Sequence, residues 1–530
     1  MQTHPLRASL RACTFIGAAL LAPLSALAVD PTPVQKELIA AVDARAKQAQ
    51  VMNDMIFSFG ELGFQEVETS RYLTALLEEN GFKVEKGISG IPTAWIATWG
   101  SGKPVIALGS DIDGIPKASQ KPGVAYHDPI VKGAPGHGEG HNSGQVVNIV
   151  AALAVKEYME ENGLKGTIKI WPGVAEEQLA TKAYYVRDGY FDDIDAVLFS
   201  HVSSDFNTSW GGGYGNGMVS VQYNFHGESA HGAGDPWRGR SALDAVMLMD
   251  VGINFRREHL RLQQRTHGIV PDGGDQPNVV PSEASIWYFF RETDYEHIKQ
   301  LWEIGDDIAK GAALMTNTTW DSTVLGSAWP WHMNKPIAEK MFENIQLVGM
   351  PEWSKDDQKL AKALQEDLGS DTAGLKTELA EKVMEGRPMK ENMGGGSDDI
   401  GDVSWRVPTI TLRYPANIPG TRGHNWSSAV AMATPIAHKG VVAGAKAQAL
   451  TLMNLLTEPA LLKAAWTYYD DVQTKDQKYI PLLRPEDKPA TFLNEEIMTQ
   501  WRPVMKDYYY DPSKYDTYLE QLGIDYPTVK

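Results

Sequence analysis

The chain has 530 residues, more than a single hydrophobic core usually organises, so the sequence predicts at least two domains. Hydrophobic residues make up 43% and charged residues 22%, values that are ordinary for a globular protein and exclude a largely disordered chain. The net charge of −18 disfavours binding to nucleic acid or to an anionic lipid surface, and no segment after residue 28 is apolar for long enough to span a membrane.

The first 28 residues differ in character from the rest of the chain. Arg7 and Arg11 precede an apolar stretch over residues 14–24, and small residues follow at 26–28, which is typical of a cleaved secretory signal. We therefore expect a periplasmic or secreted protein, with an uncleaved interfacial anchor as the alternative. The only cysteine, Cys13, lies inside this segment, so the mature chain would contain no thiol and no disulfide.

Strand and helix patterns alternate over the first part of the mature chain. Helices are predicted over 33–60 and 66–80, and further helical patterns lie at 143–161 and 178–188. Short apolar runs occur at 93–98, 105–108, 167–171 and 196–199. This alternation predicts a doubly wound α/β sheet, in which the ligand site gathers beyond the carboxyl ends of the strands.

The pattern changes near Gly217. Apolar residues then alternate with polar ones over 219–225 and again over 284–290, with a helix predicted over about 241–258 between them. Residues 217–328 are therefore predicted to form an inserted α+β domain. The α/β pattern returns with a strand at 409–412 and a helical region at 428–456, so 29–216 and 329–456 would form one catalytic domain. The tail, 457–530, is expected to wrap the surface as a C-terminal extension.

Carboxylates and imidazoles follow several of the predicted strands. Asp111 and Asp113 come directly after the strand at 105–108, and a His-Gly-Glu-Gly-His loop presents Glu139 and His141 two residues apart. Taken alone, this loop could be a flexible turn. Its alternating glycines nevertheless allow the backbone to fold tightly enough for both side chains to meet at one point.

Three more candidates follow other strands. Glu176 and Glu177 come after the strand at 167–171, His201 ends the strand at 196–199, and His424 follows the strand at 409–412. Each signal alone has another explanation. Two adjacent acidic residues often lie in solvent at the start of a helix, and a single histidine often has a structural role. Together, four strand ends deliver possible ligands to the edge where the fold predicts a site. Five ligands without a thiolate suit a pair of Zn²⁺, Mn²⁺, Co²⁺ or Ni²⁺ ions about 3.5–4 Å apart, with Glu139 as the candidate bridge.

In these residues and in the segments around them, the chain resembles the M20 metallopeptidases, in particular their amidohydrolase branch, subfamily D. The likeness runs in order through nearly the whole mature chain. The matching segments are residues 111–116, 138–142, 175–177, 200–201, 229–231, 239–244, 277–281, 397–405 and 420–426.

The resemblance implies a role for each residue of the metal site. His141, Glu177, His201 and His424 would be metal ligands, and Glu139 would bridge the two ions. Other residues would assist the reaction: Glu176 would be the general base, and Asp113 would orient a ligand histidine. In other branches a histidine occupies the position of Asp111, so that position supplies no histidine ligand here.

The resemblance also assigns roles to the inserted domain. It implies a ferredoxin-like lid that dimerises, so a homodimer is expected. His231 of one protomer would stabilise the oxyanion in its neighbour's active site, and Asn278 would contact the substrate. The alternative for His231 is a loop histidine that caps the turn following it.

Two features depart from the family pattern. The amidohydrolase branch usually has cysteine where Glu139 stands, and a carboxylate there should favour Mn²⁺ or Zn²⁺ and remove sensitivity to oxidation. The arginine that binds the substrate carboxylate in some relatives has no clear counterpart. Arg291, Arg413 and Arg422 are the candidates, each of which could equally be an ordinary ion-pair partner.

We therefore expect an enzyme that cleaves the amide bond of an N-acyl or N-aroyl amino acid, such as p-aminobenzoyl-glutamate, or of a small dipeptide-like amide. A metal aminopeptidase or dipeptidase is one alternative. A non-catalytic secreted binding protein on the same fold is another, although such a protein would not need Glu176.

Overall fold

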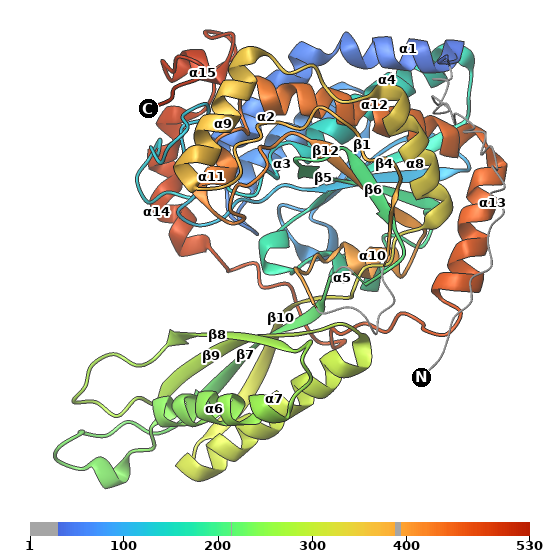
Figure 1. The fold of residues 1–530 in the computed structure, drawn as a ribbon. Helices are drawn as coiled ribbons and strands as arrows, with labels where there is room; N and C mark the ends of the chain where they lie inside the picture. Colours follow the sequence, from blue (N-terminus) through green and yellow to red (C-terminus); the bar gives the residue numbers. More distant parts are fainter. Residues whose placement is uncertain (1–29, 214, 387–393) are drawn as a thin grey trace, which may run out of the picture.

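The computed structural model describes residues 30–213, 215–386 and 394–530. The predicted signal and Cys13 lie outside the described residues. The chain forms a large α/β body and a smaller α+β unit that projects from it (Figure 1). The predicted fold class is thus confirmed. Among the described residues, no helix combines the length and the apolar character needed to cross a membrane.

The large body is built on an eight-stranded mixed sheet in the order β1-β2-β4-β3-β5-β12-β6-β11. Strands β3, β4, β5 and β12 are mutually parallel where they pair, whereas β1 and β2 add an antiparallel edge. The strands span Lys83–Lys86 (β1), Trp95–Ser101 (β2), Val105–Asp111 (β3), Gly166–Gly173 (β4), Ala196–Ser203 (β5), Asn207–Trp210 (β6), Met384–Glu385 (β11) and Thr409–Pro415 (β12).

Helices cover both faces of this sheet. Helices α1, α2, α4 and α12 lie on one face and α5 and α10 on the other (Figure 1). The helices span Pro33–Asp43 (α1), Ala46–Phe59 (α2), Val67–Glu79 (α3), Gly144–Asn162 (α4), Lys182–Arg187 (α5), Lys335–Val348 (α8), Lys355–Leu368 (α9), Ile400–Ser404 (α10), Trp426–Ala429 (α11) and Pro435–Thr457 (α12). The helix predicted over 33–60 is two helices, because Arg45 leaves helical geometry and its guanidinium caps the carbonyl of Ala41 at the end of α1.

The projecting unit contains a four-stranded antiparallel sheet in the order β10-β7-β9-β8, with helices α6 and α7. Its elements span Gly217–His226 (β7), Ala242–Arg256 (α6), Arg265–Asp272 (β8), Glu283–Glu292 (β9), Tyr295–Thr316 (α7) and Thr319–Ala328 (β10). Sequence reasoning found β7, α6 and β9 but missed the other three. Strand β8 is an exposed edge strand, so it lacks the apolar alternation that reveals a half-buried strand. The exact domain boundaries stay a prediction.

The C-terminal extension crosses from the large body to the insert and back. It contains α13 (Pro459–Tyr468), α14 (Glu495–Met505) and α15 (Tyr518–Gln521). Residues 479–487, which we call the strap, bury Leu482 and Leu483 in the hydrophobic core of the insert. The Arg484 guanidinium donates to the carbonyl of Ser322 on β10, while Arg187 on α5 donates to the carbonyl of Asp487. The strap therefore contacts both units.

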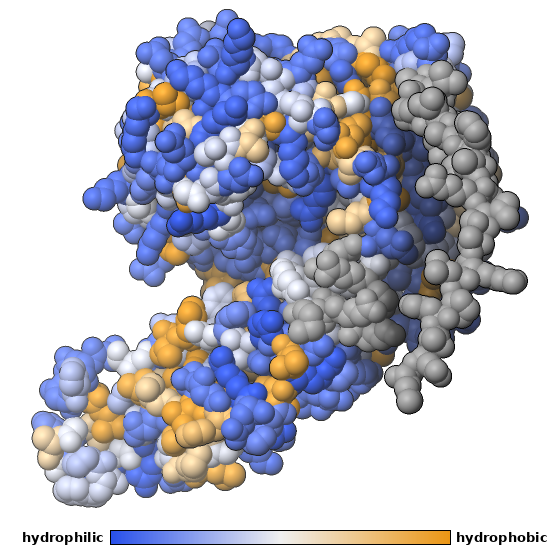
Figure 2. Space-filling view, viewed as in Figure 1, coloured by the Kyte–Doolittle hydropathy of each residue, from blue (hydrophilic) through white to orange (hydrophobic). Residues whose placement is uncertain are grey.

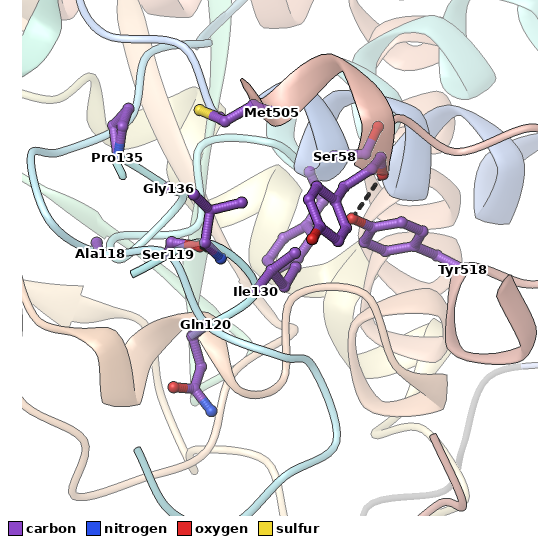
Figure 3. A pocket seen from close by; sticks show the side chains of 13 residues that line it. Ser58, Ala118, Ser119, Gln120, Ile130, Pro135, Gly136, Met505 and Tyr518 are labelled. Atoms are coloured by element: carbon purple, nitrogen blue, oxygen red, sulfur yellow. Dashed lines mark hydrogen bonds between the residues drawn. The ribbon is translucent and has the colours of Figure 1, made fainter. Parts of the chain in front are cut away.

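Further along, the extension closes a small cavity against α2 and the loop before Glu139 (Figure 3). Met505, Tyr508 and Tyr518 of the extension line it together with Phe57 and other residues. Its volume of about 20 Å³ holds little more than one water molecule, so this cavity is a packing defect rather than a ligand site.

Candidate metal centre

Four neighbouring strands bring the predicted residues to one edge of the sheet. Strands β4, β3, β5 and β12 are adjacent and parallel, so their carboxyl ends meet. Strand β3 ends at Asp111, β4 leads into Glu176 and Glu177, β5 carries His201, and the loop after β12 carries His424. The Glu139–His141 loop precedes α4, which packs on this part of the sheet. The parallel topology thus explains why residues far apart in sequence converge here.

Ligand atoms from six side chains form two sets of three. One carboxylate oxygen of Asp111 and one ring nitrogen each of His141 and His201 lie within 4.8 Å of one another. One ligand atom each of Glu139, Glu177 and His424 also lie within 4.8 Å of one another, and these three residues form the second set. Two adjoining sets of oxygen and nitrogen atoms suit a pair of divalent cations.

Glu139 lies between the two sets. Its Oε1 is 3.6 Å from Nε2 of His201, and its Oε2 is 3.4 Å from Nε2 of His424. The Nε2 atom of His424 also lies 3.3 Å from Oε2 of Glu177. Each oxygen of Glu139 thus faces a different set, which is the arrangement that a bridging carboxylate needs. The ligand roles of the five predicted residues stay a prediction, but the structure does bring all five together.

Asp113 holds two of these residues in place through hydrogen bonds. Its Oδ1 accepts a hydrogen bond from Nδ1 of His141 at 3.2 Å, and its Oδ2 accepts from the backbone N–H of Glu177 at 3.0 Å. The hydrogen bond on Nδ1 leaves Nε2 of His141 to face the site, where this buried nitrogen has no hydrogen-bond partner among the described residues. Behind the same turn, the Glu66 carboxylate accepts from the backbone N–H of Ala175, the residue before Glu176.

The backbone around the site is strained. Ala175 and Leu179, which flank the turn carrying Glu176 and Glu177, both have φ of +51°, and His424 has φ of +53°. A non-glycine residue in the left-handed region costs on the order of 1–3 kcal/mol and persists only where its surroundings enforce it. Between Glu139 and His141, Gly140 has φ of +113°, and a Cβ there would lie 2.6 Å from Sδ of Met432. Only glycine fits this position.

The electrostatics of the two histidines differ. Burial would lower the pKa of His141, but its hydrogen bond with Asp113 and the charges of Asp111 and Glu177 outweigh burial and raise the pKa to about 10. The carboxylates around this ring therefore stabilise positive charge at its position. Burial instead lowers the pKa of His201 well below its usual range, with the Arg413 charge contributing. His201 is thus a neutral imidazole, the form that binds a metal ion.

Glu176 lies beside both sets without belonging to either. Its Oε2 is 3.9 Å from Nε2 of His141, and its carboxylate forms two further close groups, one with His141 and Glu177 and one with Asp111 and Asp398. Burial, followed by the charges of Asp111 and Asp398, raises the pKa of Glu176 well above its usual range. A carboxyl group with a raised pKa can both accept and return a proton near neutral pH.

The site opens into a cavity of about 300 Å³. Its walls include Glu176 and His201, and two arginines from different units, Arg291 on β9 and Arg413 on β12. Nη1 of Arg291 donates to Oγ of Ser397 at 2.8 Å. The third candidate, Arg422, is exposed and does not line this cavity.

His231 and Asn278 lie elsewhere. Both are exposed residues of the insert, where the backbone N–H of Gly232 donates to the carbonyl of Asn278, and neither lines the cavity. Nδ1 of His231 accepts from the backbone N–H groups of Ala233 and Gly234, so this ring does cap the following turn. That contact leaves Nε2 available as a donor. A single chain does not bring these two residues to the metal centre, and their catalytic roles stay a prediction.

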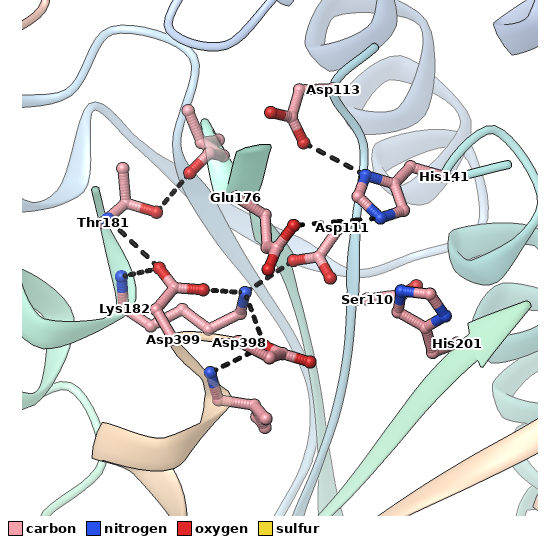
Figure 4. A network of polar contacts seen from close by, with 12 residues as sticks. Ser110, Asp111, Asp113, His141, Glu176, Thr181, Lys182, His201, Asp398 and Asp399 are labelled. Atoms are coloured by element: carbon pink, nitrogen blue, oxygen red, sulfur yellow. Dashed lines mark hydrogen bonds and ion pairs between the residues drawn. The ribbon is translucent and has the colours of Figure 1, made fainter. Parts of the chain in front are cut away.

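Sequence reasoning missed a buried ion cluster beneath the site (Figure 4). Lys182 is fully buried, and its ammonium contacts Asp111 at 2.6 Å, Asp399 more closely, and Asp398 at 3.7 Å. No local pattern marks Lys182, because a lysine at the start of a helix is usually exposed. The two aspartates lie within the matching segment 397–405, but nothing in the sequence connects them to Lys182.

Known proteins resemble this chain along most of its length. The family model of the peptidase dimerisation domain matches residues 215–314. One of the p-aminobenzoyl-glutamate hydrolase proteins of Escherichia coli (strain K12) is 33% identical over 467 residues, covering 83% of this chain and 96% of that protein. The Xaa-Arg dipeptidase of Mus musculus is 27% identical over 432 residues, covering 80% and 89%.

A solved structure has the same fold. The aminobenzoyl-glutamate utilization protein from Klebsiella pneumoniae superposes with a TM-score of 0.53 at 17% identity, covering 76% of this chain and 98% of that one. At this identity the match concerns the architecture, namely an α/β body with a projecting α+β unit.

We predict that Asp113→Ala weakens divalent-metal binding by about 10- to 100-fold, because His141 and the Glu177 backbone lose their common acceptor. Competition with a chromophoric chelator measures the affinity. Asp205→Ala is the control, since Asp205 is an exposed acid whose carboxylate pairs, within the described part of the chain, with Lys376. An unchanged affinity in Asp113→Ala would show that Asp113 does not position the ligands.

Proposed function

Because this chain belongs to the M20 family of metallopeptidases, we propose that it is a metal-dependent amidohydrolase acting on N-acyl or N-aroyl amino acids. The first candidate substrate is p-aminobenzoyl-glutamate, the compound named in the Escherichia coli relative. One observation carries the proposal: two adjoining sets of ligand atoms lie together at the wall of one cavity, which the second set and His201 line, and the Glu176 carboxyl group lies beside both sets.

The residues of the site fit the chemistry of amide hydrolysis. Divalent ions held there would polarise the substrate carbonyl and lower the pKa of a water molecule. Glu176 would accept the proton of that water as its oxygen adds to the carbonyl carbon. The same proton would pass to the amine nitrogen as the carbon–nitrogen bond breaks, which returns Glu176 to its starting form.

The donor set also bears on the identity of the ions. Carboxylate and imidazole ligands without a thiolate support Zn²⁺ or Mn²⁺, and Co²⁺ or Ni²⁺ also fit. The two arginines of the cavity wall support a substrate with a carboxylate. Arg291 is our first candidate for binding it, because its buried Nε has no hydrogen-bond partner among the described residues.

A dipeptidase is the second candidate function. The Mus musculus relative is named a dipeptidase, and Asp398 places a carboxylate in the cavity wall where a free α-amine could pair with it. A binding protein without catalysis is disfavoured, because the chain retains Glu176 and the relatives are named hydrolases.

We further propose that the protein works as a homodimer joined through the insert. Met247, Val251 and Phe255 lie four residues apart on α6, so they form one apolar stripe, and they are 55%, 45% and 77% exposed. Figure 2 shows apolar residues gathered on the insert. Such a dimer would let the exposed His231 reach the partner's cavity. Export across a membrane, on the basis of the first 28 residues, remains part of this proposal.

A hydrolysis panel tests the function. We expect p-aminobenzoyl-glutamate or an N-acyl amino acid to be cleaved faster than dipeptides, with activity lost on chelation and restored by Zn²⁺, Mn²⁺ or Co²⁺. Release of the free amine, followed by chromatography, measures the rate. Turnover at full rate in chelator-treated, metal-free protein would refute the metal mechanism, and a preference for dipeptides would favour the second candidate.

Glu176→Ala should lower turnover by about 10²- to 10⁴-fold while both ions stay bound, because it removes the proton acceptor and leaves the ligands in place. Initial rates and metal analysis of the same sample measure the two effects. A variant that loses its metal instead would show that Glu176 is a ligand.

His231→Ala should also lower turnover strongly with unchanged metal content. Mixed dimers of one His231→Ala chain and one Glu176→Ala chain should recover about half of the wild-type activity, since each mixed dimer contains one intact site out of two. Co-expression with two affinity tags provides the mixed dimers. No recovery in purified mixed dimers would argue that the site is not shared between protomers.

A further inference from the structure

One carboxylate oxygen of Asp111 has no role in the site as predicted from the sequence. Asp111 is fully buried at the end of β3, and its Oδ1 contacts the Lys182 ammonium at 2.6 Å. Its Oδ2 is also buried but has no hydrogen-bond partner among the described residues. A buried, charged oxygen without a partner destabilises the folded state. A native protein therefore normally provides it with a hydrogen-bond donor or a cation.

The free oxygen faces the metal site. In Figure 4 it points away from Lys182, toward the side where His141 and His201 lie. A carboxylate oxygen of Asp111 lies within 4.8 Å of a ring nitrogen of each histidine, and Nε2 of His141 is itself buried and unpartnered among the described residues. Two independent buried atoms therefore face one position at which a cation would compensate them.

Asp111 also belongs to a second acidic group, with Glu176 and Asp398. There the Lys182 ammonium already provides a positive charge, since it lies 2.6 Å from Asp111 and 3.7 Å from Asp398. One ammonium does not balance the buried carboxylates that surround it, namely Asp111, Glu176, Asp398 and Asp399. A further cation would compensate this charge best beside the two histidines, where Asp111 forms its other close group.

The fold holds Lys182 and Asp111 together closely. The backbone N–H of Lys182 donates to Oδ2 of Asp399 at 3.1 Å, and its ammonium contacts Oδ1 of the same residue. On β4, Gly173 leaves room for the contact, because a Cβ there would lie 1.8 Å from Oδ1 of Asp111 and 2.9 Å from Nζ of Lys182. Lys182 therefore holds one oxygen of Asp111 and leaves the other directed at the histidines.

We propose that Asp111 is a sixth metal ligand, which completes with His141 and His201 the protein ligands of one ion, and that Lys182 is the residue that positions it. Glu139, Glu177 and His424 would hold the other ion, with Glu139 facing both. This inference rests on the proposed metal centre and extends it by one ligand and one positioning residue.

The ligand role is tested with Asp111→Asn, which keeps the shape of the side chain. Wild-type protein should take up two Co²⁺ or Zn²⁺ ions per chain. Asp111→Asn should keep one ion and bind the other at least about 10-fold more weakly, a loss within the range seen when a metal site is perturbed. Chelator competition measures both affinities, and the visible spectrum of the Co²⁺ form should change as an oxygen ligand is lost.

Asp402→Asn is the matched control. Asp402 is equally buried, but its carboxylate accepts from the Trp329 backbone and the Tyr479 hydroxyl and takes no part in either ligand set. This variant should keep two ions with wild-type affinity and the wild-type Co²⁺ spectrum.

The role of Lys182 is tested with Lys182→Met. Removal of a nearby positive charge should by Coulomb's law alone strengthen cation binding. If Lys182 positions Asp111, binding of the same ion should instead weaken, and the double variant with Asp111→Asn should be no weaker than Asp111→Asn alone. Lys182→Gln, which keeps an N–H donor, serves if Lys182→Met does not fold. Stronger or unchanged binding, or losses that add, would overturn the positioning role.

The outcomes separate this inference from the proposed function. Wild-type protein that takes up no ions would refute the metal centre as a whole. Wild-type protein that binds two ions, together with Asp111→Asn that binds two with the same affinity and spectrum, would refute only the sixth ligand.

Discussion

Burying a carboxylate away from water is costly unless a cation or several hydrogen bonds compensate its charge, and this chain buries several at one edge of its central sheet. Asp111, Asp113, Glu176 and Asp399 are all at least nine-tenths buried there, yet Lys182 is the only fully buried lysine or arginine among the described residues. Hydrogen bonds satisfy Asp113 and Asp399. Burial and the remaining negative charge together raise the pKa of Glu176, and the same charge would attract cations, so metal binding and the stability of this edge would be coupled.

The sequence alone allows the prediction of those features that the residue types of short segments indicate. Glycines around Glu139 and His141, and histidines and carboxylates after several apolar runs, together predict a metal site, although each of these signals alone also has a structural explanation. The parallel strand order then explains their convergence. The burial of a side chain is not visible in this way, which is why Lys182 and its contacts with three aspartates were missed. The same limit applies to β8, whose exposed edge position removes the alternation that made β7 and β9 recognisable.

Other predicted features would depend on more than one chain. His231 and Asn278 are adjacent in the insert, but the fold of a single chain keeps them exposed and outside the cavity wall. A sequence motif can predict a role for such residues without indicating in which protomer's site they would act. The apolar stripe on α6 and the hydrogen-bonded Nδ1 of His231, which leaves Nε2 as a donor, are consistent with a site completed by a neighbour.

The strap has a mechanical consequence for the insert. The chain enters and leaves this unit through two paired strands, since Met218 on β7 lies opposite Ala328 on β10. Such a narrow stem would bend in any direction. Leu482 and Leu483 add a third attachment beside the stem, while Tyr479 and Asp487 anchor the same segment to α10 and α5. Together with the Arg291–Ser397 hydrogen bond, the strap would restrict the directions in which the insert can swing over the cavity. Substrate entry and product exit would then depend on the same restricted motion.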